Sequence, residues 1–382
     1  MTKQERQAKL RKMWGKYHPR TIADELGVSR RTLRRDVAEL GLPPYEEETA
    51  DDIVHEVSES LKLRTERTKT RKLADQLKRA REQIEAVFKL KEHRGVFEIK
   101  HRSTKADTRA VAVAVISDLH IEEVVDPETV NGLNEYNEEV CKVRMNRLFV
   151  HMVKLIKLNQ LHTQIDTLLL AILGDLISSN IHDELLETAR CQPIDAALEA
   201  LEYLETGIQY ILDNTDVDLI IPCKVGNHSR ITKKVHISTE SGNSLEWFIY
   251  NTLANRFKGN KRVTFIIERS QETYVQVWPN FTVRCMHGHS IKGGGGIGGI
   301  TAPIFRAIFK MNKTISADLT LLGHFHQYLN LGKAIVNGSG IGWAPFASFI
   351  HAGYELPRQA FCLIDERVGV TVACPIILTE DR

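Results

Sequence analysis

The sequence predicts a mixed α/β protein in which two β-sheets pack face to face, preceded by a small all-α domain and a charged helical linker. From about residue 110 onward, apolar runs rich in Val, Ile and Leu first alternate with helical patterns and later follow one another directly. Residues 45–109 are dense in charge, and residues 1–44 carry two short amphipathic patterns. We therefore expect three parts, with boundaries at 1–44, 45–109 and 110–382.

Composition limits the classes of protein to consider. The chain has 382 residues, 42% of them hydrophobic, which is enough for a large buried core. The net charge is only +2, but Lys and Arg concentrate before Arg109, which indicates an anionic partner for the N-terminal part. The six cysteines show no Cys-x-x-Cys spacing and no apolar run reaches the ~20 residues of a membrane span. We expect a soluble cytoplasmic protein with reduced thiols and no membrane partner.

The first part carries a two-helix pattern. A short helix around Ile22 and Leu26 is followed by Gly27, a residue suited to a left-handed turn, and Ser29 is a typical N-cap for a second helix. This pattern resembles the helix-turn-helix of DNA-binding regulators and recombinases, which implies a nucleic-acid partner, DNA first. The exposed side of the second helix would present Arg30, Arg31, Arg34 and Arg35 to phosphates and guanine edges. The alternative is a protein-interaction module with a solvated basic face.

The second part, residues 45–109, begins acidic and becomes strongly basic. It has no Pro and no Gly between Asp51 and Arg94, and its few apolar residues are spaced for a long exposed helix. Two such helices could pair as a short coiled coil and make the protein a homo-oligomer. The apolar repeat is interrupted over 65–70, so a solvated single helix or a flexible tether is the alternative.

The third part has the element order of a layered α/β domain. Helical patterns lie near 140–160, 183–213, 244–257 and 304–312. Strand patterns that precede polar clusters occupy 111–117, 167–173, 218–225, 281–286 and 317–322, and further strands are expected at 263–268, 273–278, 333–338, 361–366 and 370–377.

Metal-type ligands follow five of these apolar runs. Strands in a sheet lie only ~4.8 Å apart, so side chains at the ends of successive strands can converge although about two hundred residues separate them. Carboxylate, imidazole and amide groups are what a pair of divalent ions requires. The clusters, in chain order, are Asp118 with His120, Asp175 after Gly174, Asn227 with His228 after Gly226, His287, and His324 with His326 after Gly323.

The order of these clusters resembles the calcineurin-like metallophosphoesterase superfamily over about residues 111–337. The resemblance implies a four-layer αββα sandwich with two metals at the strand ends, a hydroxide between the metals as nucleophile, and His228 as proton donor to the leaving group. It further implies that Asp118, His120 and His326 hold the first metal, that Asn227, His287 and His324 hold the second, and that Asp175 bridges them. Mn²⁺ is the expected metal, and the ligand types equally accept Fe, Zn or Ni.

Two features depart from the superfamily pattern or add to it. An acidic residue commonly follows the Gly-Asn-His motif and helps to orient the histidine, whereas this chain has Ser229. The basic residues that come next, Arg230 and Lys233, are candidate substrate contacts, with a solvated loop as the alternative. The glycine-rich stretch 292–300 is expected either to close over substrate as a flap or to be an ordinary packed loop.

The function predicted from these parts is a two-metal phosphodiesterase, a nuclease that hydrolyses DNA. The stretches GDLISSNIHDEL (174–185) and GNHSR (226–230) are similar to phage-type, DNA-repair-exonuclease-like metallophosphoesterases. One alternative is a phosphatase or small-nucleotide phosphodiesterase that uses the helix-turn-helix for localisation. Another is a DNA-binding regulator with a structural metal domain, although the complete ligand set argues against it.

Overall fold

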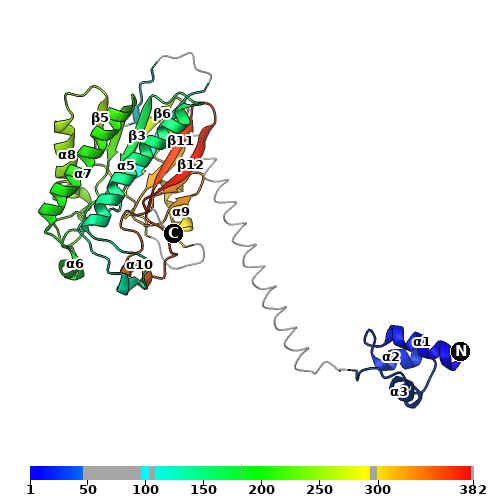
Figure 1. Cartoon of the computed structure of the whole chain (residues 1–382). Helices are drawn as coiled ribbons and strands as arrows, with labels where there is room; N and C mark the ends of the chain where they lie inside the picture. The colour runs from blue at the N-terminus through cyan, green and yellow to red at the C-terminus, as the bar shows by residue number, and fades with distance from the viewer. Residues whose placement is uncertain (46–95, 103–107, 182, 293–298, 380–382) are drawn as a thin grey trace. The chain divides into compact units, whose positions relative to one another are not determined.

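The computed structural model describes residues 1–45, 96–102, 108–181, 183–292 and 299–379 (Figure 1). The chain divides into two compact units between residues 76 and 77. The described part of the first unit is helical, and the second unit is α/β. Most of the predicted linker, and residues 293–298 of the glycine-rich stretch, lie outside the described residues.

The N-terminal unit is a bundle of three short helices with its own apolar core. Helix α1 spans Lys3–Met13, α2 spans Pro19–Glu25 and α3 spans Arg30–Glu39. Gly27 has a φ of +64°, and the Ser29 side chain caps α3 by accepting a bond from Thr32 N at 3.2 Å. The sequence patterns did not predict α1. It is held to α3 by an ion pair at 2.6 Å between Arg6 and the buried Asp36.

The first sheet of the α/β unit has the order β12-β11-β2-β3-β4-β5. Its four strands β2 to β5 run parallel, and β11 and β12 extend it antiparallel. All seven residues of β2 and all six of β3 are buried, as expected for parallel strands covered on both faces. The bounds are β2 Ala110–Ile116, β3 Thr167–Ile172, β4 Asp218–Cys223, β5 Val263–Ile267, β11 Arg358–Asp365 and β12 Gly369–Ile377.

The second sheet has the order β1-β6-β7-β8-β10-β9. Strands β7, β8 and β10 are parallel to one another. Strand β1, at Val96–Glu98, pairs with β6 and so belongs to this sheet although it precedes residue 110. The other bounds are β6 Thr273–Trp278, β7 Phe281–Met286, β8 Leu319–Leu322, β9 Leu329–Asn330 and β10 Ala334–Val336.

Alternating side chains divide the α/β unit into four layers. Along β2, Ala112 and Ala114 join the core under the helices, whereas Val113 and Val115 join the core between the sheets. Helices α5, α7 and α8 cover the first sheet, and α9 packs on the second (Figure 1). The predicted mixed α/β sandwich of two face-to-face sheets is confirmed.

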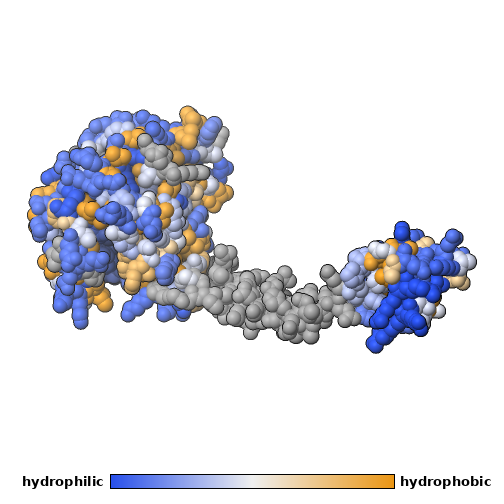
Figure 2. Space-filling model, turned by 60° about the horizontal axis from the view of Figure 1, so that its bottom comes forward, coloured by the Kyte–Doolittle hydropathy of each residue, from blue (hydrophilic) through white to orange (hydrophobic). Residues whose placement is uncertain are grey.

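The four helical patterns of the α/β unit lie at the predicted positions with one difference, and the short helix at Pro345–Phe349 was not predicted. The single helix expected over 183–213 is two helices, because Pro193 lacks an N–H and disfavours helix in the residue before it. None of the described helices is long and apolar enough to cross a membrane. Hydrophilic residues cover much of the face seen in Figure 2. The bounds are α5 Glu138–Gln160, α6 Asp183–Thr188, α7 Pro193–Asn214, α8 Leu245–Arg256, α9 Thr301–Met311 and α10 Pro345–Phe349, with 3₁₀ turns η1 Pro127–Val130, η2 Ile237–Thr239 and η3 Ser241–Asn243.

Candidate metal centre

The predicted metal ligands gather where the two sheets meet, beyond the carboxyl ends of parallel strands. Strands β2, β3 and β4 of the first sheet lead into the first three clusters, and β7 and β8 of the second sheet lead into the others. Contacts across the sheets bring the clusters together: His324 N donates to Asp118 Oδ1 at 2.9 Å, and His287 Nδ1 lies 2.6 Å from Leu173 O. Ligands from all five loops therefore surround one place.

One group of candidate ligands consists of Asp118, His120 and His326, whose ligand atoms lie within 4.8 Å of one another. The Nε2 atoms of the two histidines are 3.2 Å apart, and His326 Nε2 is 3.3 Å from Asp118 Oδ1. Two imidazole nitrogens and a carboxylate oxygen aimed at one point form a donor set that fits a divalent cation.

The second group consists of Asp175, His287 and His324, again with ligand atoms within 4.8 Å. His287 Nε2 lies 3.0 Å from Asp175 Oδ2 and 3.1 Å from Asn227 Oδ1, so the predicted amide ligand shares this place. Because His287 Nδ1 is bonded to a backbone carbonyl, its Nε2 is left to face the carboxylate, which is the usual arrangement of a metal-binding histidine.

The backbone at these ligands is strained in a way that few residues tolerate. Eight non-glycine residues of the described ranges have a positive φ, and most of them are predicted ligands. Side chains with a Cβ adopt this region at a cost, so the fold must hold them there. The ligands concerned are Asp118 (53°), His120 (49°), Asp175 (51°), His324 (70°) and His326 (52°).

The glycines of the motifs are required by close approach. A Cβ at Gly226 would overlap Asp175 Oδ1, and a Cβ at Gly323 would lie 2.5 Å from Asp118 Oδ2. Each glycine thus lets a loop of one cluster pass directly against a carboxylate of another. The Gly-Asn-His and Gly-His motifs are explained by packing within the site.

Burial and charge perturb the imidazoles in opposite directions. Burial lowers the pKa of His120 and of His287, but the carboxylates of Glu123 and Asp175 outweigh it and raise these pKa values to about 9 and about 10. Burial and the charge on His287 instead lower the pKa of His324 to about 3. The centre therefore holds ionised carboxylates beside both protonated and neutral imidazoles.

Three glutamates organise the centre, two of them buried and Glu123 half-buried, and sequence patterns gave no role to any of them. Glu123 Oε1 lies 3.2 Å from His120 Nδ1 and accepts a bond from Ser178 Oγ, which lies 2.5 Å from the same nitrogen. Glu122 Oε1 accepts bonds from two backbone N–H groups just beyond Asp175. Glu246 accepts from Leu176 N and Gly226 N, both at 2.7 Å, and so joins two ligand loops. Glu122 and Glu123 follow the Asp-x-His motif after one residue, Ile121, which was the available signal.

His228 lies inside the centre with its backbone N–H donating to Asp175 Oδ1 at 2.8 Å. Its ring is perpendicular to that of His120, with centroids 4.9 Å apart. Burial lowers its pKa to about 4, so the imidazole is neutral at pH 7. Ser229 points away and pairs with Ser244 Oγ at 2.7 Å, so the residue after the Gly-Asn-His motif does not orient this histidine.

The predicted substrate contacts differ in how they are engaged. Arg230 directs its guanidinium to the backbone carbonyls of Asn227, Thr232 and Lys233, which fixes the shape of its own loop. Lys233 is exposed on that loop, and so is Lys234. In the N-terminal unit, the four predicted arginines of α3 are all exposed, at positions 30, 31, 34 and 35.

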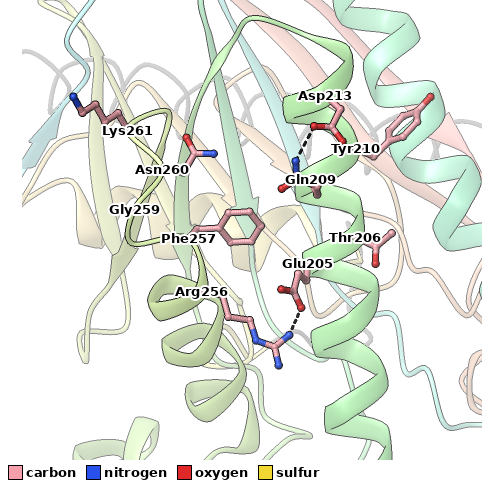
Figure 3. Close-up of a pocket in the computed structure, with 10 residues that line it drawn as sticks. All are labelled: Glu205, Thr206, Gln209, Tyr210, Asp213, Arg256, Phe257, Gly259, Asn260 and Lys261. Carbon is pink, nitrogen blue, oxygen red and sulfur yellow. Dashed lines mark hydrogen bonds and ion pairs between the residues drawn. The ribbon is translucent and has the colours of Figure 1, made fainter.

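A groove of about 920 Å³ lies between α7 and α8, away from the metal ligands (Figure 3). It is near the amino ends of β4 and β5, whereas the ligands follow carboxyl ends. Within it, Arg256 forms an ion pair with Glu205, and the Gln209 amide donates a hydrogen bond to Asp213. It has no cluster of metal-ligand side chains and plays no part in the site.

No protein-family model matches the chain. No curated protein matches its sequence. Similar solved structures include a protein described as a 5′-nucleotidase from Staphylococcus aureus, with a TM-score of 0.34 and 11% identity. The match covers 72% of this chain and 55% of that chain, so it spans about half of that protein. A serine/threonine phosphatase from Saccharomyces cerevisiae has a TM-score of 0.28 and 10% identity over 80% of this chain and 91% of that chain. At these values the likenesses carry no inference about function, which rests on the site itself.

We predict that Gly226→Ala displaces the Asp175 carboxylate and removes tight binding of divalent metal. The added methyl group overlaps Asp175 Oδ1, and neither loop can retreat without breaking the bonds to Glu246. Gly259→Ala is the matched control, because nothing lies within 4 Å of a Cβ there. Calorimetric titration with Mn²⁺ measures the effect, and wild-type affinity in Gly226→Ala would contradict it.

We also predict that metal affinity increases with pH. The pKa values of about 9 and about 10 mean that His120 and His287 are both imidazolium cations at pH 7 in the metal-free protein. Each therefore carries one proton more than the neutral ring that binds a metal. A metal must displace these protons, so binding releases them and becomes tighter as pH rises towards those values. Titrations at about pH 6 and about pH 8.5, in buffers of different ionisation enthalpy, measure both effects. Equal affinity without proton release would refute the assignment of these two ligands.

Proposed function

We propose that this protein is a metal-dependent phosphoester hydrolase of the calcineurin-like metallophosphoesterase class, and that it hydrolyses phosphodiester bonds of DNA. One observation carries the proposal: two groups of three metal-ligand side chains lie side by side at converging strand ends. A pair of adjacent divalent cations is a common device for displacing an alkoxide from a phosphate ester.

The side chains fit such a pair of cations. Asp118, His120 and His326 supply one carboxylate and two imidazoles to the first ion. Asp175, His287 and His324 face the second, with Asn227 beside them. We propose that the Asp175 carboxylate serves both ions. When bound, two divalent ions lower the pKa of a water molecule and neutralise charge on the phosphoryl oxygens. The mixed N/O donors suit Mn²⁺, and equally Fe, Zn or Ni.

His228 is our candidate for the proton donor to the leaving oxygen. Its backbone is fixed on Asp175, and its ring stands against that of His120. With a pKa of about 4, it is neutral before substrate arrives. A phosphodiester anion beside the ring favours the imidazolium and raises this pKa, so substrate binding itself prepares the donor.

DNA is proposed as substrate because of the N-terminal unit. Four exposed arginines lie on one short helix that Ser29 caps and a left-handed Gly27 precedes. Guanidinium groups on a helix of this size are suited to phosphates and to guanine edges in the major groove. We infer that this unit, a helix-turn-helix module, delivers the hydrolase to DNA.

The direct test is hydrolysis by chelator-treated protein with Mn²⁺ restored. We expect cleavage of end-labelled DNA and of the small diester bis-p-nitrophenyl phosphate. We expect Asp175→Ala to abolish both, because it removes the carboxylate that we propose to serve both ions. Circular dichroism of the variant checks that the fold persists. Cleavage that survives the substitution would refute the mechanism. Turnover of phosphomonoesters alone would favour a phosphatase or small-nucleotide phosphodiesterase that uses its N-terminal unit for localisation.

A second test concerns the arginines of α3. Changing Arg30, Arg31, Arg34 and Arg35 together to Ala should weaken DNA binding. It should also make the slope of log Kd against log salt concentration shallower, by about 0.9 for each DNA phosphate that an arginine no longer neutralises. Hydrolysis of bis-p-nitrophenyl phosphate should not change, because the substitutions lie outside the catalytic unit. DNA affinity equal to that of wild type across a salt series would refute the DNA-binding role.

A further inference from the structure

The segment that follows β10 is fastened at both ends to loops that carry metal ligands. Near its start, Gly340 N donates to Asp118 O at 2.8 Å. Near its end, the Glu355 carboxylate accepts from Tyr328 N at 2.9 and 3.0 Å, two residues beyond His326. The segment between these anchors, which contains α10, therefore forms part of the rim of the centre.

Between the anchors this rim exposes a surface of aromatic and apolar side chains, which we name the α10 surface. It consists of Phe346, Phe349, Ile350 and Tyr354, with exposed fractions of 69%, 80%, 53% and 50%. Tyr354 stands edge-on to Trp343 with ring centroids 5.8 Å apart. Helix α10 itself has the sequence PFASF and carries no charge. Rings gathered in this way commonly mark a binding surface.

Only a short length of chain separates the α10 surface from the loop that carries His326. A Cβ at Gly353 would be 3.9 Å from the side chain of Gln327, next to His326. Phe349 is four residues earlier, and four residues span at most about 14 Å. Figure 1 shows α10 at the same end of the unit as α6, which follows the Asp175 loop. In Figure 2, which brings this end forward, hydrophobic residues lie among hydrophilic ones.

The charge near the centre complements these rings. Lys233 and Lys234 are exposed on the loop that follows Asn227, and Arg230 holds that loop in shape through its backbone carbonyls. A nucleic-acid strand presents both features that such a rim would recognise, a chain of phosphates and a series of flat bases. Aromatic stacking with bases contributes about 1–3 kcal/mol per base and tolerates every sequence.

We propose that the α10 surface stacks the bases of single-stranded nucleic acid next to the phosphodiester at the metals. This rests on the proposed function and adds a strand preference to it, because bases in a duplex are already stacked and offer no free face. The surface is too small to be the interface of a stable dimer. At roughly 200 Å² per ring, its three aromatic residues expose about 400 Å², against about 800 Å² per partner in a typical stable interface.

The test compares Phe346→Ala/Phe349→Ala with wild type on three substrates in the presence of Mn²⁺. These are a single-stranded oligonucleotide, the same strand in a duplex, and bis-p-nitrophenyl phosphate, which has no base. We expect the KM for the single strand to rise at least about tenfold, with no change for the small diester. An abasic strand should be as poor a substrate for wild type as the normal strand is for the variant. Leu161→Ala/Val368→Ala is the matched control, with exposed fractions of 71% and 74% away from the site.

Each other result has a definite meaning. Equal KM values for the single strand in wild type and variant would overturn the stacking role, as would a wild-type enzyme that prefers duplex. Loss on the small diester as well would mean damage to the metal loops and would also overturn it. A wild-type dimer in sedimentation velocity that dissociates in the variant would assign the surface to a second copy. If wild type hydrolyses none of the three substrates, the proposed function itself fails.

Discussion

The close approach of two loops, one after β3 and one after β4, is the constraint on which the rest of the centre depends. Gly226 has no side chain, so its backbone lies directly against Asp175. Asp175 is thereby held with one oxygen bonded to His228 N at 2.8 Å and the other 3.0 Å from His287 Nε2. This one carboxylate joins loops of both sheets.

Loops that meet so closely leave some backbone N–H groups without a backbone acceptor. Buried carboxylates accept hydrogen bonds from these groups. Glu246 accepts hydrogen bonds from Leu176 N and Gly226 N. Glu122 accepts them from the N–H groups of Ser178 and Ser179. Burial and the nearby Asp175 charge raise the pKa of Glu246 to about 7, which shows how far this carboxyl is removed from water. An unpaired buried N–H costs about 1–3 kcal/mol, so these bonds offset part of the cost of burying the carboxyls. The same rigidity allows five ligands to keep a positive φ.

The sequence was informative wherever a local pattern controls the structure. Buried parallel strands need continuous apolar runs, so β2, β3 and β4 could be placed together with the polar residues that end them. Local patterns were weaker elsewhere. Strand β1 is three residues long and exists because it pairs with β6, some 180 positions away, and α1 has little amphipathic pattern. The break between α6 and α7 has a local signal in Pro193, but the helical patterns on both sides of it favour one continuous helix.

The amino-acid sequence by itself determined the types and order of the candidate ligands and the strands that carry them, because both depend on neighbours in the chain. It also indicated the basic face of α3, since the arginines recur at helical spacing. Only the tertiary structure decided that Glu246 joins two ligand loops, that Arg230 is engaged with its own loop, and that the segment bearing the α10 surface is anchored to the loops of Asp118 and His326. Those relations depend on distances in the folded chain, and no local periodicity encodes them.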